Sequence, residues 1–281
     1  MSLTNRLVLS LVTLQLSIFT SFGWSADILG EIPRTHDGRP DLNGIWQAMG
    51  SDHFNLEANM GAASRILATG ALGAARGSLG AVLGGKIPYL PEARAQQQTN
   101  FAQRDALDPA VKCYMPGVPR ANYMPFPLQI VQIPDHVFIA YEFAQASRTL
   151  YIDQPTFEAP VDTWMGHSLA RWEGETLVVD VTAQVADTWL DQAGNLHSRD
   201  LHVEERYDLM SAHHLRYRAT LTDARVYTKP WTLEVILYKN IHPKAQLLDF
   251  RCIEHVEELM YGHLSKTANN EQNGAEGNAD E

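Results

Sequence analysis

The strongest constraint in this sequence is a series of short segments in which apolar and polar side chains alternate. These segments are residues 128–133, 137–143, 148–152, 167–171, 176–181, 201–207, 215–222, 231–238 and 246–254. Successive side chains of a strand point to opposite faces, so each segment predicts a strand with one buried face. A further strand is expected from Gly44, and the short connections favour antiparallel neighbours.

A sheet with so many strands rarely stays open, because unpaired edges promote aggregation. We therefore expect an all-β chain in which residues 26–264 form one domain. Its architecture would be an up-and-down antiparallel barrel of about 8–10 strands. The clearest hairpin in it is the one that turns at Glu173-Gly174-Glu175.

Two stretches depart from the strand pattern. Residues 57–87 are rich in alanine and glycine, which predicts a helical insertion packed on the barrel; a lid or a lipid-touching flap is the alternative. Residues 88–127 are rich in proline, which is typical of an extended connector laid across a surface.

The two ends are expected to lie outside the fold. Residues 1–25 have the layout of a secretory signal peptide, and an uncleaved anchor helix is the alternative. Residues 265–281 predict a disordered acidic tail. We therefore expect a periplasmic or secreted protein whose mature chain does not insert stably in a membrane. The formal charge of −11 argues against nucleic acid as a partner.

The chain contains two cysteines, Cys113 and Cys252. In an oxidising compartment such a pair predicts a disulfide, and two unpaired buried thiols are the alternative.

One carboxylate stands out against the strand pattern. Alternation places Glu205 on the same face as Leu201, Val203 and Tyr207. An unpaired carboxyl on an apolar face has a raised pKa, as a general acid or base near neutrality requires. The alternative is a buried salt bridge with an arginine such as Arg171 or Arg206.

Other candidates accompany Glu205. His167 shares a strand face with Leu169 and Arg171, so it is a candidate partner base if that face points inward; a structural histidine is the alternative. The further catalytic candidates are Asp187 and His202, and the candidates for substrate binding are Tyr141, Arg120, Trp189, His197 and Trp164.

Each of these further candidates has an expected role. Asp187, His197 or His202 would orient the substrate or the partner residue, and Tyr141 or Arg120 would stabilise developing negative charge. Tryptophans such as Trp164 and Trp189 would stack on a sugar or line an apolar pocket, or belong to the core.

A metal site built from three of the histidines is a weaker alternative, because the spacing of His167, His197 and His202 is not one used by known zinc sites. We expect no metal and no cofactor.

Several motifs resemble known families. Gly44-Ile45-Trp46 resembles the Gly-x-Trp signature of lipocalins, in which an arginine packs over the tryptophan; Arg251 is placed to do so here. Other stretches are similar to exported bacterial proteins of uncharacterised function. They are residues 40–46, 113–120, 164–168, 171–180 and 201–206. This resemblance implies a lipocalin-like barrel and export, and no activity.

These observations favour a periplasmic enzyme that performs acid–base proton transfer, of the isomerase, lyase or hydratase type. Its substrate would be a small apolar or glycosidic molecule, with Glu205 and His167 as the acid–base pair. The main alternative is a non-catalytic, lipocalin-like carrier of a hydrophobic ligand. A structural envelope protein is the third possibility.

Overall fold

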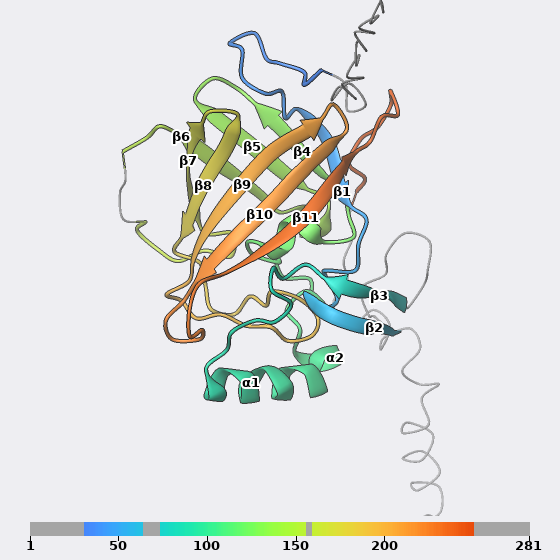
Figure 1. Ribbon diagram of the computed structural model, residues 1–281, viewed down its shortest axis with the longest axis vertical. Helices are drawn as coiled ribbons and strands as arrows, with labels where there is room; N and C mark the ends of the chain where they lie inside the picture. The colour runs from blue at the N-terminus through green and yellow to red at the C-terminus, as the bar shows by residue number, and fades with distance from the viewer. Residues whose placement is uncertain (1–30, 64–73, 156–158, 250–281) are drawn as a thin grey trace, which may run out of the picture.

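The computed structural model describes residues 31–63, 74–155 and 159–249, and in them nine strands close into a single barrel (Figure 1). The order around the barrel is β1-β11-β10-β9-β8-β7-β6-β5-β4, and β4 pairs with β1. The strands are β1 (Gly44–Ala48), β4 (Leu128–Gln132), β5 (His136–Tyr141), β6 (Ser147–Ile152), β7 (His167–Glu173), β8 (Thr176–Thr182), β9 (His202–Ser211), β10 (His214–Thr222) and β11 (Trp231–Lys239). The predicted all-β barrel is confirmed.

The barrel is not antiparallel throughout. Strands β6 and β7 are parallel, with Leu150 opposite Ser168 and Ile152 opposite Ala170. Parallel neighbours need a long crossover, and the connection from residue 153 to residue 166 supplies it. The expectation of a strictly up-and-down, antiparallel topology is therefore wrong at this pair.

Alternating side chains fill the barrel. On β9 the residues Val203, Glu205, Tyr207 and Leu209 are buried, while those between them are partly exposed. They face an equally regular set on β10, where Ala219 lies opposite Glu205. Burying one large apolar side chain contributes roughly 1.5–3 kcal/mol, so this regular alternation fixes which face of each strand points inward.

The barrel closes without the predicted strand at residues 246–254. Strand β11 pairs directly with β1, residues 246–249 form no strand, and the rest of that segment lies outside the described residues. Arg251 lies there too. In the described structure the cation over the Trp46 ring is Lys239, with its Nζ 5.2 Å from the ring centre.

The predicted helical insertion is wrong. Strands β2 (Glu57–Ala63) and β3 (Ala74–Gly80) form a separate two-stranded sheet, and residues 81–87 contain no helix. Glycine is unfavourable inside a helix but is needed in this two-stranded sheet. A Cβ at Gly80 would lie 2.7 Å from the carbonyl oxygen of Leu56, the residue just before β2.

The helices lie instead in the proline-rich stretch, which is therefore not a plain extended connector. Helix α1 (Pro91–Ala102) begins with a proline at its first turn, where the missing N–H costs nothing. It is followed by α2 (Arg104–Leu107) and by the short 3₁₀ helix η2 (Arg120–Tyr123). No helix in the described part of the chain is long and apolar enough to cross a membrane.

Helices α1 and α2 lie at the same end of the barrel as the β2–β3 sheet (Figure 1). The predicted signal peptide (1–25), the acidic tail (265–281) and Cys252 lie outside the described residues, so the signal peptide, the tail and the disulfide of Cys252 stay predictions.

Candidate functional site

The predicted site residues do not come together in one place. Glu205 and Tyr141 lie in the barrel interior, whereas His167 and His202 lie on its outer surface. Asp187, Trp189, His197 and Trp164 meet in an open cleft at the helix-bearing end, and Arg120 is buried in η2.

Glu205 is sealed inside the barrel, as the alternation predicts, with 0% of its surface exposed. Its Oε2 forms an ion pair with Nη2 of Arg148 from β6. Its Oε1 accepts hydrogen bonds from Asn122 Nδ2 at 2.9 Å, Tyr217 Oη at 2.8 Å and Tyr207 Oη at 3.1 Å. A carboxylate that is matched by so many donors and closed to solvent is held as a structural group.

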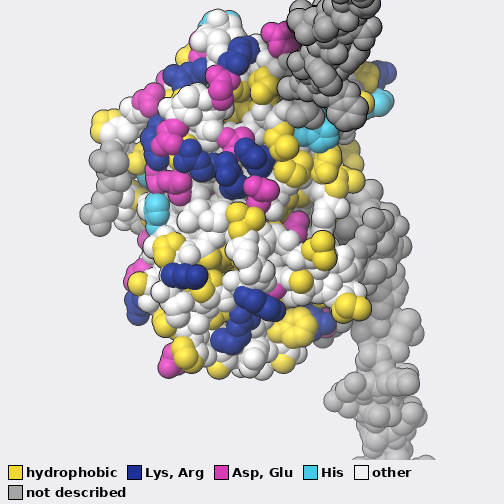
Figure 2. All heavy atoms as spheres, viewed as in Figure 1, with side chains coloured by type: hydrophobic (Ala, Val, Ile, Leu, Met, Phe, Trp, Pro, Cys, Tyr) yellow, Lys and Arg dark blue, Asp and Glu magenta, His cyan; other side chains and the backbone are white. Residues whose placement is uncertain are grey.

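The salt-bridge alternative for Glu205 is therefore observed, but the arginine is Arg148. The two arginines named from the sequence, Arg171 and Arg206, lie on the outer face and pair with acids there. Figure 2 shows basic and acidic side chains side by side on one outer face of the barrel. His202 also pairs on the outer face, with its Nε2 2.9 Å from Asp180 Oδ1.

Tyr141 belongs to the same interior network. Its hydroxyl donates to Asn122 Oδ1 at 3.0 Å, and burial raises its pKa above the ordinary value for a phenol. Burial opposes the charged form of Arg148, yet the nearby Glu205 carboxylate holds its pKa well above the ordinary value. The interior thus keeps a neutral Tyr141 beside a charged Arg148 at ordinary pH.

His167 does not point into the barrel. Ser168 and Ala170 are the buried residues of β7, so His167 and Leu169 face outward. The His167 ring stacks on Tyr151, with ring centres 5.6 Å apart. The expected acid–base pair of Glu205 and His167 is therefore not assembled, because the two side chains lie on opposite faces of the barrel wall.

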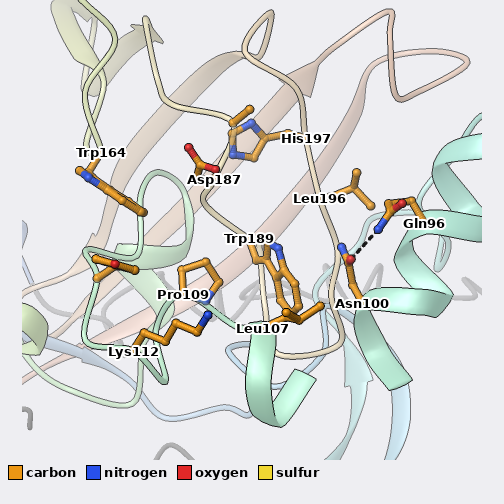
Figure 3. Close-up of a pocket in the computed structure, with 12 residues that line it drawn as sticks. Gln96, Asn100, Leu107, Pro109, Lys112, Trp164, Asp187, Trp189, Leu196 and His197 are labelled. Atoms are coloured by element: carbon orange, nitrogen blue, oxygen red, sulfur yellow. Dashed lines mark hydrogen bonds between the residues drawn. The ribbon is translucent and has the colours of Figure 1, made fainter. Parts of the chain in front are cut away.

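The cleft at the barrel end has a volume of about 540 Å³. It is lined by Gln96 and Asn100 of α1, by Leu107, Pro109, Lys112 and Tyr114, by Trp164, and by Ala186, Asp187, Trp189, Leu196 and His197 of the β8–β9 connection. Figure 3 shows Trp164 and Trp189 on two sides of the hollow, Asp187 beside His197, and Lys112 on the opposite wall. Pockets of this size, with aromatic walls and a few polar groups, are typical of small-molecule sites.

Aromatic surface in the cleft is open to solvent. Tyr114 stacks on Trp164, with ring centres 4.9 Å apart and planes 18° apart. Tyr114 remains 48% exposed and Trp164 is partly exposed, whereas Trp189 is largely buried, at 9%.

Two residues of η2, Arg120 and Tyr123, make buried polar contacts that hold both walls of the cleft. Arg120 pairs with both carboxylate oxygens of Asp108, at 2.7 and 2.8 Å, next to the wall residue Pro109. Tyr123 Oη donates to the Leu190 carbonyl of the other wall at 2.8 Å. Arg120 thus holds a wall of the cleft, and its charge is already matched by Asp108.

His197 is fixed and neutral. Its Nδ1 lies 2.8 Å from the Ser198 carbonyl, which only accepts, so Nδ1 carries the proton. Its Nε2 then accepts from the Thr188 hydroxyl at 2.6 Å. Burial lowers the pKa of His197, so the ring is uncharged near neutral pH.

Helix α1 docks on the loop of the opposite wall at Gly194. Asn100 Nδ2 donates to the Gly194 carbonyl at 3.2 Å, and Gln97 Nε2 donates to Ala193 at 2.6 Å. Gly194 has φ +76°, and a Cβ there would lie 2.5 Å from Asn100 Cβ. Glycine is therefore required for both its backbone angle and the close approach of the helix.

Of the twelve residues that line the cleft, only Trp164, Asp187, Trp189 and His197 were candidates from the sequence, and one whole wall was missed. The residues from α1 and from the segment after α2 were not candidates, namely Gln96, Asn100, Leu107, Pro109, Lys112 and Tyr114. Pro91 at a helix start was an available signal for α1. Cys113 adjoins Tyr114, and its proposed partner Cys252 lies outside the described residues, so the disulfide stays a prediction.

The described residues contain no group of three or more His, Cys, Asp or Glu side chains arranged to hold a metal ion. His197 in the cleft lies apart from His167 and His202 on the outer surface, so the three-histidine alternative is not assembled. No protein-family model, curated protein or solved structure matches this chain. The resemblance to lipocalins and to exported bacterial proteins therefore stays an expectation.

Proposed function

We propose that this protein binds a small ring-shaped molecule, a sugar or a glycoside, in the cleft at the barrel end. The observation that carries the proposal is the meeting of Tyr114, Trp164 and Trp189 in one open hollow. A flat aromatic surface suits the apolar C–H face of a sugar ring, since it buries that face without competing for its hydroxyls.

Polar groups around the aromatic walls support the same class of ligand. Asp187 and the exposed Gln96 supply oxygen acceptors for hydroxyl groups, and Lys112 supplies a donor. A purely hydrophobic ligand would bury these groups without partners, which costs free energy. The site therefore favours a polar ring over the hydrophobic cargo of a lipocalin-like carrier.

Binding is a better account than acid–base catalysis by Glu205. That carboxylate has no route to solvent and all its contacts are to protein donors. His167, its expected partner, faces away from it. We therefore propose that the protein binds its ligand at a site outside the barrel interior. Export through the predicted segment 1–25 belongs to the same proposal, and N-terminal sequencing of the mature protein tests it.

Calorimetric titration with a panel of neutral, acidic and amino sugars and short oligosaccharides tests the function. Trp164→Ala should weaken the binding of any ligand found by at least about tenfold, as truncation of a central tryptophan commonly does. The control is Trp172→Ala, which removes another half-buried tryptophan, located on β7 near Arg39 and away from the cleft. Equal effects of the two substitutions, or no binding across the panel, would contradict the proposal.

A further inference from the structure

The cleft contains two charges that the described part of the chain leaves unmatched. Within the described residues, neither the Lys112 ammonium nor the Asp187 carboxylate has a hydrogen-bond or ion-pair partner. The buried arginines near the cleft and in the barrel are, by contrast, paired: Arg120 with Asp108 and Arg148 with Glu205. Unmatched charges beside aromatic walls are groups available to a ligand.

The two charges lie on different walls of the hollow. Asp187 comes from the β8–β9 connection and lies beside His197, while Lys112 projects from the opposite wall beyond Pro109 (Figure 3). The backbone of Lys112 is fixed in a turn, where its N–H donates to the Pro109 carbonyl at 3.1 Å. The buried pair of Asp108 and Arg120 anchors the start of that turn. The ammonium is therefore presented from a defined wall and not from a free loop.

We infer that the ring bound in the cleft is an acidic sugar, one whose ring carries a carboxylate, as in a uronic acid. Its carboxylate would pair with Lys112, its hydroxyls would donate to Asp187, and its C–H face would lie on the aromatic walls. This inference rests on the proposed function and specifies the ligand of that site.

The alternatives fit the charges less well. A cationic ligand suits tryptophans and a carboxylate, but Lys112 would repel it. A neutral sugar satisfies Asp187 and leaves the ammonium without its counter-charge. A uronic acid meets both in one orientation, with its carboxylate at Lys112 on the wall opposite Asp187, its hydroxyls at Asp187 and its ring faces free to stack.

The test compares methyl β-D-glucuronide with methyl β-D-glucoside, which differ only at C6, by calorimetric titration at low ionic strength. Choline is the cationic probe. The inference predicts that the glucuronide binds at least about tenfold more tightly than the glucoside, and that this preference shrinks as salt is added. Lys112→Gln should abolish the preference, and Lys112→Arg should keep most of it. The matched control is Lys229→Gln, which removes an exposed lysine that does not line the cleft and should leave the preference intact.

Failure of the inference is distinguishable from failure of the proposed function. If the glucoside or choline binds as well as the glucuronide and Trp164→Ala weakens that binding, the acidic-ligand inference is overturned and the binding site stands. If Lys112→Gln, folded as judged by its thermal melt, keeps the preference, Lys112 is not the recognition group and the inference falls. If none of the sugars binds, both proposals fall.

Discussion

The barrel interior and the cleft both contain charged side chains, but within the described structure these side chains are paired in the interior and unpaired in the cleft. In the interior Glu205 is surrounded by Arg148, Asn122 and tyrosine hydroxyls, and it is closed to solvent. In the cleft Asp187 and Lys112 face a hollow, and neither has a side-chain partner among the residues that the structure describes. The difference shows how to interpret a carboxylate on an otherwise apolar strand face. When the fold supplies its ion-pair and hydrogen-bond partners, as for Glu205, the carboxylate has a structural role.

The largest expected effect follows from breaking the interior network. Glu205→Gln should lower the free energy of unfolding by about 3–5 kcal/mol, because it leaves the Arg148 charge buried without a counter-charge. Ligand binding by the folded fraction should be unchanged. Urea unfolding followed by fluorescence measures the first quantity and titration the second.

The neighbouring residue on β9 is the control. Glu204 faces outward and forms a partly exposed pair with Arg206 at 3.3 Å, so Glu204→Gln should cost no more than about 1 kcal/mol. If Glu205→Gln proves folded and stable but no longer binds ligand, the assignment of Glu205 to structure is wrong.

The second effect concerns pH and the buried His53 at the same end of the barrel as the cleft. Burial, and secondarily Arg120, lowers the pKa of His53 from 6.5 to about 4. A depressed pKa contributes stability above pH 6.5 that is lost as the pH falls towards 4. By linkage this loss is roughly 3 kcal/mol. His53→Gln should therefore lose less stability than the wild type between pH 6.5 and pH 4, as measured by urea midpoints.

Asp191 acts in the opposite direction over the same pH range. Burial raises its pKa from 3.8 to about 6, so its contribution is fully present below pH 3.8 and is lost as the pH rises through 6. The two groups partly cancel in the wild type, and the His53→Gln variant should reveal the Asp191 contribution. Identical pH profiles for variant and wild type would show that His53 titrates normally.

The third effect concerns Gly194, where helix α1 docks beside the cleft, and it tests whether this docking shapes the binding site. Gly194→Ala should weaken ligand binding and cost about 1–3 kcal/mol, because the new Cβ meets Asn100 at a positive φ. Gly38→Ala is the matched control, since Gly38 has φ +83° and nothing within 4 Å of its Cβ position. Thermal melts and titrations of both variants should show a shared backbone cost, with loss of binding confined to Gly194→Ala. Equal binding by the two variants would show that the docking of α1 does not shape the site.

The smallest effect on stability is expected in the cleft itself. Asp187→Asn should change the free energy of unfolding by no more than about 0.5 kcal/mol, because this exposed carboxylate has no partner in the described part of the chain. It should nevertheless weaken ligand binding about tenfold or more, as loss of a charge-assisted hydrogen bond does. Asp187→Asn should thus reduce binding and spare stability, whereas Glu205→Gln should reduce stability and spare binding. A large loss of stability in Asp187→Asn would show that Asp187 is a structural group.

Alternation predicted the barrel well and the site only in part. It placed Glu205 inside, because a run from Leu201 to Tyr207 tolerates only one register. It gave the wrong face for His167, whose strand is only partly apolar on either side. The identity of Arg148 as the partner was beyond local pattern, since β6 and β9 are separated by two other strands in the barrel.

The cleft was harder to predict than the barrel because it has no local signature. Its walls come from residues 96–114 and 164–197, which are far apart in sequence and meet only in the folded structure, through η2 and through contacts such as that of Asn100 with Gly194. The aromatic residues Trp164 and Trp189 were recognisable as candidates. Tyr114 and Lys112 were not, because they lie in a stretch whose prolines suggested a plain connector.

The most direct test of the central claim is an NMR titration of the tryptophan indole signals with methyl β-D-glucuronide. If the ligand binds in the cleft, the indole signals of Trp164 and Trp189 shift, while those of Trp46 and Trp231 in the barrel core stay in place. Shifts confined to Trp46 and Trp231 would place the ligand in the barrel and contradict a binding site in the cleft.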